Sequence, residues 1–187
     1  MSRVRRATLL SEEGVDSMIA AAYGAAFLSR RDRALLEVLY GSGLRVAEAC
    51  GLDVEHLDLE RGTAQVLGKG GKRRTVPLTR PAVDALRAWL TWRREGPVFR
   101  NARDERMDVR LARKIVAKYA VQADLPHSSP HTLRHSCASH MLRRGAYLFN
   151  VQDLLGHAHP QTTAVYLHRM PVDRTPDQDY RSAHPRA

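Results

Sequence analysis

Apolar residues recur every three or four positions through the first fifty residues, which is the spacing of helices with one buried face. Ser11 is expected to start the first helix, because a serine oxygen accepts hydrogen bonds from the free amides of a first helical turn. Ser29 is expected to start a second helix, which Gly41 and Gly43 should end. Residues 44–51 predict a short third helix.

The pattern changes in the next segment to short runs that are typical of strands. Residues 63–67 and 74–78 predict two antiparallel strands, and the glycine-rich residues 68–72 between them suit a hairpin turn. Residues 97–99 are expected to add a third short strand. The sequence therefore predicts one small antiparallel sheet.

Helical spacing returns after the hairpin, and Pro81 suits the first turn of the next helix because no amide hydrogen is needed there. Pro171 and Pro176 interrupt the polar last residues, which are expected to be loosely held. The predicted fold class is α+β, a mostly α-helical domain with one small three-stranded antiparallel β-sheet. The helices expected after the hairpin cover residues 81–92, 108–122, 132–144, 148–155 and 162–167.

The bulk composition limits the class of protein. The chain has 187 residues, of which 43% are hydrophobic, and this is enough for one domain with its own core. No apolar run is long enough to span a bilayer and no signal-peptide core follows the basic first residues, so a cytoplasmic location is expected. Cys50 and Cys137 lie in helical patterns without metal-ligand spacing and are expected to be small core residues.

The charge balance indicates a partner. Thirty Lys and Arg residues against twenty Asp and Glu residues give a net charge of +10 at pH 7. A compact basic domain attracts polyanions, of which nucleic acid is the commonest. Charge alone leaves open a ribosomal or membrane-surface protein, or a charge that serves solubility only.

Several polar residues have the spacing of a phosphate site. His131 and Arg134 are three residues apart, so a helix places both side chains on one side. The arginine fork matches two phosphate oxygens and the histidine can donate a proton, although both residues could equally be solvated in a first helical turn. Arg45 could be no more than a surface partner of Glu48. Residues 68–72 are not a nucleotide-binding loop, because the GxxxxGK[ST] spacing and a following helix are missing.

Five motifs follow one another along the chain, and their order is far more specific than any one of them. Together they resemble the motifs of the tyrosine recombinases, the phage integrase family, with spellings similar to those of the bacterial Xer recombinases. The resemblance covers residues 8–168, and residues 183–187 share it. The motifs are YGSGLRVAE (40–48), GKGGKRRTVPL (68–78), SPHTLRH (129–135), LLGH (154–157) and TTAVY (162–166).

The resemblance implies site-specific DNA recombination, in which a tyrosine attacks a phosphodiester and holds the DNA end as a 3′-phosphotyrosine. Two arginines stabilise the phosphate charge in place of a metal ion, so no metal, ATP or other cofactor is expected. The implied catalytic residues are Arg45, Lys69, His131, Arg134, His157 and the nucleophile Tyr166, with Glu48 supporting the first arginine. Further phosphate contacts to DNA are expected at Lys72, Arg73, Arg74, Arg143 and Arg144.

The resemblance also implies a division of the chain and a set of partners. Residues 1–170 correspond to the catalytic domain and residues 171–187 to a C-terminal tail, and the family's N-terminal core-binding domain is expected to be absent. The expected partner is double-stranded DNA, bound by a tetramer on two paired sites, with or without a second recombinase. Two alternatives stay open, a catalytically weak DNA-binding remnant of a mobile element and an enzyme similar to type IB topoisomerases.

Overall fold

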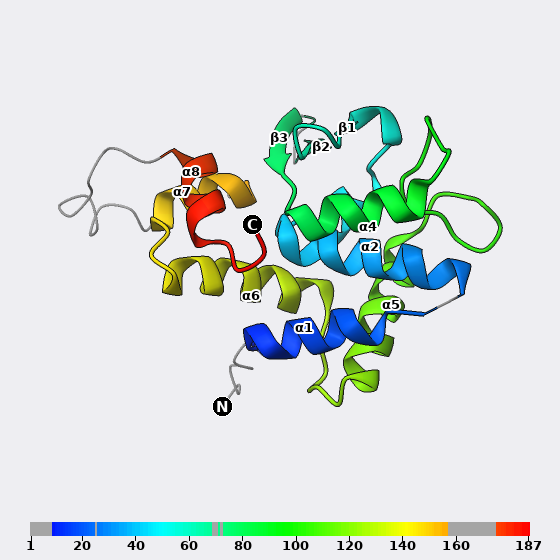
Figure 1. Cartoon of the computed structure of the whole chain (residues 1–187), viewed down its shortest axis with the longest axis horizontal. Coiled ribbons are helices and arrows are strands. Elements are labelled where there is room, and N and C mark those ends of the chain that lie inside the picture. Colours follow the sequence, from blue (N-terminus) through cyan, green and yellow to red (C-terminus); the bar gives the residue numbers. More distant parts are fainter. Residues whose placement is uncertain (1–8, 25, 69–70, 72, 157–174) are drawn as a thin grey trace.

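The computed structural model describes residues 9–24, 26–68, 71, 73–156 and 175–187. Helices surround one core, with the small sheet along one side and the last two described helices beside each other at one end (Figure 1). The elements are α1 (Glu12–Ala21), α2 (Phe27–Gly41), α3 (Val46–Cys50), a 3-10 turn (Val54–His56), β1 (Leu57–Asp58), β2 (Thr63–Leu67), β3 (Arg73–Pro77), α4 (Arg80–Leu90), α5 (Val109–Gln122), α6 (Pro130–Arg143), α7 (Leu148–Leu155) and α8 (Pro176–Ala183). The predicted α+β class is confirmed, and the helix expected at 162–167 lies outside the described residues.

Helix α2 is the central element of the core. Leu35, Leu36 and Leu39 are fully buried, and α2 packs along α4 (Figure 1) and also contacts α6. The predicted start at Ser29 is wrong, because the helix begins at Phe27 without a side-chain cap. The ring of Phe27 lies 4.9 Å from that of Trp89 on α4, so packing between helices, rather than a cap, accompanies the earlier start.

The sheet has the order β1-β2-β3, and both neighbouring pairs are antiparallel. The two hairpin strands agree with the sequence within one residue, but the third strand is Leu57–Asp58 and the strand predicted at 97–99 is wrong. Pro97 forms only an isolated bridge with Asp53, since proline has no amide hydrogen to donate. The Val98 carbonyl accepts from the Trp89 indole instead, at 2.7 Å.

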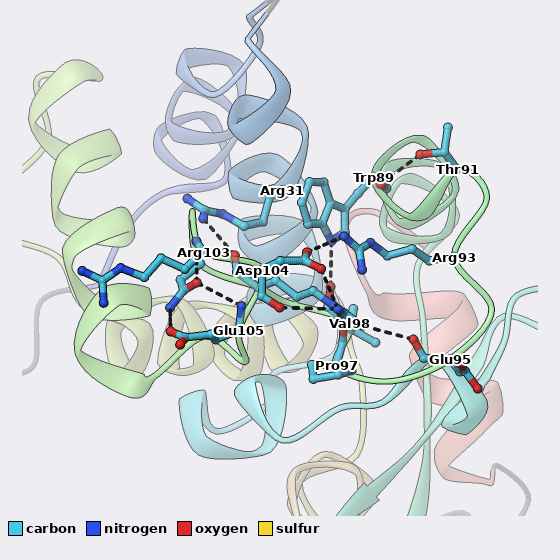
Figure 2. Close-up of polar contacts among 12 residues, drawn as sticks. Arg31, Trp89, Thr91, Arg93, Glu95, Pro97, Val98, Arg103, Asp104 and Glu105 are labelled. Atoms are coloured by element: carbon cyan, nitrogen blue, oxygen red, sulfur yellow. Dashed lines mark hydrogen bonds and ion pairs between the residues drawn. The ribbon is translucent and has the colours of Figure 1, made fainter.

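The connection from α4 to α5 is held by arginines. Asp104 forms ion pairs with both Arg93 and Arg100, and Arg31 of α2 donates to the Arg100 carbonyl at 2.9 Å. Figure 2 shows Asp104 between Arg31 of α2 and Arg93 of the connection itself. The contacts fix the chain that leads into α5, whose first turn is capped by Asp108.

The last residues are not loosely held, so that prediction is wrong for 175–187. Pro176 begins α8 rather than interrupting a helix, because proline is favourable at the first helical position and Thr175 supplies the cap. Tyr180 is buried, and Arg186 pairs with the buried carboxylate of Glu37 at 2.7 Å. Pro171 lies outside the described residues.

Both cysteines are buried, which confirms that they are core residues. Burial raises the pKa of Cys50 to about 11 and that of Cys137 to about 12, so both thiols stay protonated at neutral pH. Among the described helices, none is both long and apolar enough to cross a membrane.

His184 carries a pH dependence of stability. Its ring lies between those of Tyr40 and Tyr180, and burial lowers its pKa from 6.5 to about 4, with smaller contributions in the same direction from Arg186, His140 and Arg144. Between these two pH values His184 is protonated in the unfolded chain and neutral in the folded chain.

The free energy of unfolding should therefore fall as the pH is lowered from about 6.5 to about 4, by up to about 3 kcal/mol from His184. Urea unfolding at a series of pH values measures this loss. A His184→Gln variant removes the titrating group, so its stability should fall less over the same window. Parallel curves for the two proteins would contradict the assignment.

Candidate active site

The first part of the site is the turn between α2 and α3. Gly43 has a φ of +56°, and a Cβ atom there would overlap the Leu155 side chain, so only glycine allows α7 to approach this closely. Two residues later, Arg45 is the N-cap residue of α3. The turn therefore directs Arg45 towards the end of α7.

Glu48 fixes the position of Arg45 from behind. Its carboxylate accepts from the Arg45 amide at 2.9 Å and from the Arg45 guanidinium at 3.0 Å. Arg74 of β3 donates to both oxygens of the same carboxylate, at 2.8 and 3.0 Å. Burial alone would raise the pKa of Glu48, but the hydrogen bonds from Arg74 and Arg45 outweigh burial and keep this pKa below 4.5. Glu48 is therefore an ionised anchor between two arginines.

Arg134 is the second arginine and comes from the first turns of α6, a helix that Ser129 caps. Its side chain is buried, and its guanidinium donates to the carbonyls of Gly43 and Leu155, the latter at 2.7 Å. Burial and the nearby charge of Arg45 lower the pKa of Arg134 to about 10. Arg134 thus remains charged at neutral pH, held by neutral carbonyl groups.

The end of α7 joins the two arginines. The Gly156 carbonyl accepts from Arg45 at 2.9 Å, one residue after the carbonyl that accepts from Arg134. Gly156 ends α7 in the left-handed conformation, with φ of +66°. Both guanidinium groups are therefore held by carbonyls of the last two described residues before position 157.

A cavity of about 420 Å³ opens beside the arginine pair. Its charged lining is cationic, because no carboxylate is among the described residues that line it. It can therefore accept an anion the size of a phosphate group. The lining residues are Leu44, Arg45, Val46, Arg113, Pro130, His131 and Arg134.

The structure brings together three of the six residues expected to be catalytic, Arg45, His131 and Arg134, with Glu48 behind them. Lys69, His157 and Tyr166 lie outside the described residues, as does Lys72. Their roles, like the roles of the placed residues, stay predictions.

The residues expected to contact DNA lie in different surroundings. Arg73 donates to the His56 ring at 2.8 Å, and Arg74 is bound to Glu48. Arg143 and Arg144 are at the far end of α6, about 15 Å along the helix from the arginine of the cavity. Arg144 pairs there with Glu12 at 2.6 Å. Their DNA contacts stay predictions.

Arg113 is a cavity residue that the sequence did not single out. It lies on α5, is exposed, and has no ion pair among the described residues. Arg110 and Lys114 are exposed on the same helix, three residues before and one after. The sequence shows that α5 is rich in basic residues, but it does not show that α5 packs close to α6. Within the described parts of the chain, no group of three or more His, Cys, Asp or Glu residues is placed to hold a metal ion.

The chain is similar to known proteins along most of its length. The family model described as the phage integrase family matches residues 3–171. Tyrosine recombinase XerC of Corynebacterium efficiens is 45% identical over 163 residues, which are 84% of this chain and 52% of that protein. Tyrosine recombinase XerC of Mycobacterium tuberculosis is 44% identical over 197 residues, covering 99% of this chain and 65% of that protein.

Solved structures give the same result for the fold. The crystal structure of XerA recombinase superposes with a TM-score of 0.75 at 30% identity, over 87% of this chain and 61% of that one. The structure of the XerH site-specific recombinase bound to its difH substrate superposes with a TM-score of 0.72 at 27% identity, over 87% of this chain and 50% of that one. The chain thus spans between half and two thirds of the length of these relatives. From its sequence and its fold, the chain belongs to the phage integrase family of tyrosine recombinases.

Proposed function

We propose that this chain breaks and rejoins DNA in site-specific recombination, with Tyr166 as the nucleophile. The observation that supports this most is the convergence of Arg45 and Arg134 on one cavity with a cationic lining. A phosphodiester that is attacked gains negative charge on its nonbridging oxygens. Two planar guanidinium groups can hold this charge at fixed positions, which lowers the barrier more than mobile water does.

The proposed reaction is a transesterification. The Tyr166 oxygen forms a bond to phosphorus while the bond from phosphorus to the 5′-oxygen breaks, which leaves a 3′-phosphotyrosine and a free 5′-hydroxyl. A phenol has a pKa of about 10, so its proton must be accepted as it attacks. We assign this role to His131, which lines the cavity. The leaving oxygen takes a proton, which we assign to Lys69. His157 is assigned a hydrogen bond to the phosphate.

Rejoining is the same reaction in reverse. The 5′-hydroxyl of another strand attacks the phosphotyrosine and releases the tyrosine, so the energy of the original bond is kept throughout. Cleavage and rejoining therefore need no ATP. The proposed partners are double-stranded DNA and further protomers on paired sites, with or without a second recombinase. The XerH structure bound to difH supports DNA as the partner by analogy.

Recombination and simple relaxation give different products, which provides the test. A supercoiled plasmid that carries two copies of a candidate site should yield recombinant circles, and a plasmid without the site should stay supercoiled. Rapid relaxation of both plasmids would indicate a topoisomerase-like activity instead. DNA binding without any cleavage of a wide set of sites would indicate a remnant that only binds.

Arg113 should contribute a phosphate contact next to the arginine pair. An Arg113→Ala variant is expected to bind DNA about 3- to 10-fold more weakly and to lower the slope of log K against log salt by about one. Fluorescence anisotropy at several salt concentrations measures both. Arg61→Ala, which removes an exposed arginine paired with Asp58, is the matched control. An unchanged salt slope in Arg113→Ala would place this arginine outside the DNA interface.

A further inference from the structure

Helix α7 is capped from a distant part of the chain. The helix begins after Tyr147, whose side chain makes no capping hydrogen bond. Asp179 of α8 takes this role instead, because its carboxylate accepts from the Tyr147 amide at 2.8 Å and from the Asn150 side chain at 2.9 Å. Asp179 is fully buried. A buried carboxylate at the positive end of a helix stabilises both the position and the direction of that helix.

The opposite end of α7 is the part that holds the two arginines. The Leu155 carbonyl accepts from Arg134 and the Gly156 carbonyl from Arg45. The helix has eight residues, so its ends are only about 12 Å apart. Because a short helix moves as a unit, a shift at the capped end displaces the carbonyls at the other end.

The same tail also fixes the other group that holds Arg134. The Tyr180 hydroxyl donates to the Gly41 carbonyl at 2.9 Å, two residues before the Gly43 carbonyl that accepts from Arg134. One residue of α8 therefore contacts the start of α7, and the next contacts the last residue of α2, just before the turn that carries Gly43. Both supports of Arg134 depend on where α8 lies.

We propose that Asp179 is a positioning residue for the arginine pair, acting by capping α7 from α8. Asp179 does not line the cavity, and it determines where the carbonyls of Leu155 and Gly156 hold Arg134 and Arg45. The inference rests on the proposed function for its effect on cleavage. The effect of Asp179 on how firmly Arg45 and Arg134 are held in place is independent of that function.

Cleavage by an Asp179→Ala variant provides the first test. At saturating DNA the rate of covalent adduct formation should fall about 10- to 100-fold, as expected when a small misplacement reaches the reacting groups. The DNA concentration for half saturation should stay unchanged. Asp179→Asn preserves the shape of the side chain and one acceptor oxygen, so its rate of adduct formation should fall less. It replaces the alanine variant in this test if that variant does not fold. Arg181→Ala, an exposed residue of α8 paired with Asp177, should cleave like the unchanged protein.

A second substitution distinguishes capping from a general loss of folding. Adding Tyr147→Asp to Asp179→Ala places a cap on α7 itself, because aspartate is favoured at this position. This double variant should recover most of the lost cleavage rate. If Asp179→Ala cleaves at the full rate, or if the double variant does not recover, the proposal is overturned.

An NMR measurement tests the inference without cleavage. The Nη–H groups of Arg45 and Arg134 donate the hydrogen bonds that hold the pair, so their signals should be sharp and slowly exchanging in the unchanged protein. These signals should be shifted or broadened in Asp179→Ala. The double variant should restore them. Unperturbed arginine signals in Asp179→Ala would overturn the proposal. An unchanged protein that forms no adduct would overturn the proposed function instead, and the arginine signals would still decide the role of Asp179.

Discussion

Replacing Arg134 with lysine is expected to lower the rate of strand cleavage by about 100-fold or more, the usual cost of removing one preorganised donor from a transition state. Arg134 is held by the carbonyls of Gly43 and Leu155, which fix the plane of its guanidinium at the cavity. A lysine keeps the charge but has one compact ammonium group, so it cannot bind both carbonyls and a phosphate in the same plane. Single-turnover cleavage of nicked DNA measures the rate.

The matched control for this prediction lies on α4. Arg80→Lys alters an exposed arginine whose partner is Asp84, and Arg80 does not line the cavity. It should cleave at close to the rate of the unchanged protein. If Arg134→Lys were to cleave as fast as Arg80→Lys, the arginine fork would not be the group that stabilises the transition state.

Replacing Glu48 with alanine is expected to lower the free energy of unfolding by about 3–5 kcal/mol, because it leaves two arginines without their shared buried partner. Arg45 and Arg74 would then repel each other and Arg134. Arg45 would also lose the contacts that direct it to the cavity, so cleavage should fall as well. Urea unfolding at pH 7 gives the stability, and Glu60→Gln, at an exposed ion pair with Arg87, is the control.

The pKa of Glu48 adds a pH dependence to this prediction. Because its folded pKa is held below 4.5, its stabilising contribution is fully present above that pH and is lost as the pH falls through the folded pKa. The difference in stability between the unchanged protein and Glu48→Ala should therefore shrink on acidification below about pH 4.5. A difference that stays constant down to pH 3, or no difference at pH 7, would show that the carboxylate is not the anchor.

The spacing of apolar residues and the turn residues correctly predicted those helices and strands that depend only on neighbouring residues. Residues 148–155 form α7 as expected, and the hairpin strands agree within one residue. The tail was misjudged because Pro176 was interpreted as a break, whereas a proline at the first helical position starts a helix. Its burial depends on Gly41 and Glu37, more than 100 residues away in the chain, and no local pattern carries that contact.

In the candidate site too, the sequence predicted some features correctly and missed those that depend on long-range contacts. The order of the motifs predicted that Arg45, His131 and Arg134 would meet, and the structure places them at one cavity. Arg74 was expected to contact DNA, yet its guanidinium is bound to Glu48, across the gap between β3 and α3. Arg113 was missed because only the packing of helices brings α5 to the cavity. Both depend on long-range contacts that sequence spacing does not contain.

The most direct measurement of the central claim is a covalent adduct on Tyr166. Nicked duplexes that carry candidate crossover sites are incubated with the protein, and the products are separated under denaturing conditions. The unchanged protein should give an adduct, mass spectrometry should locate the DNA on Tyr166, and a Tyr166→Phe variant should give none while still binding DNA. An adduct that persists in Tyr166→Phe, or that maps to another residue, would contradict the proposed mechanism.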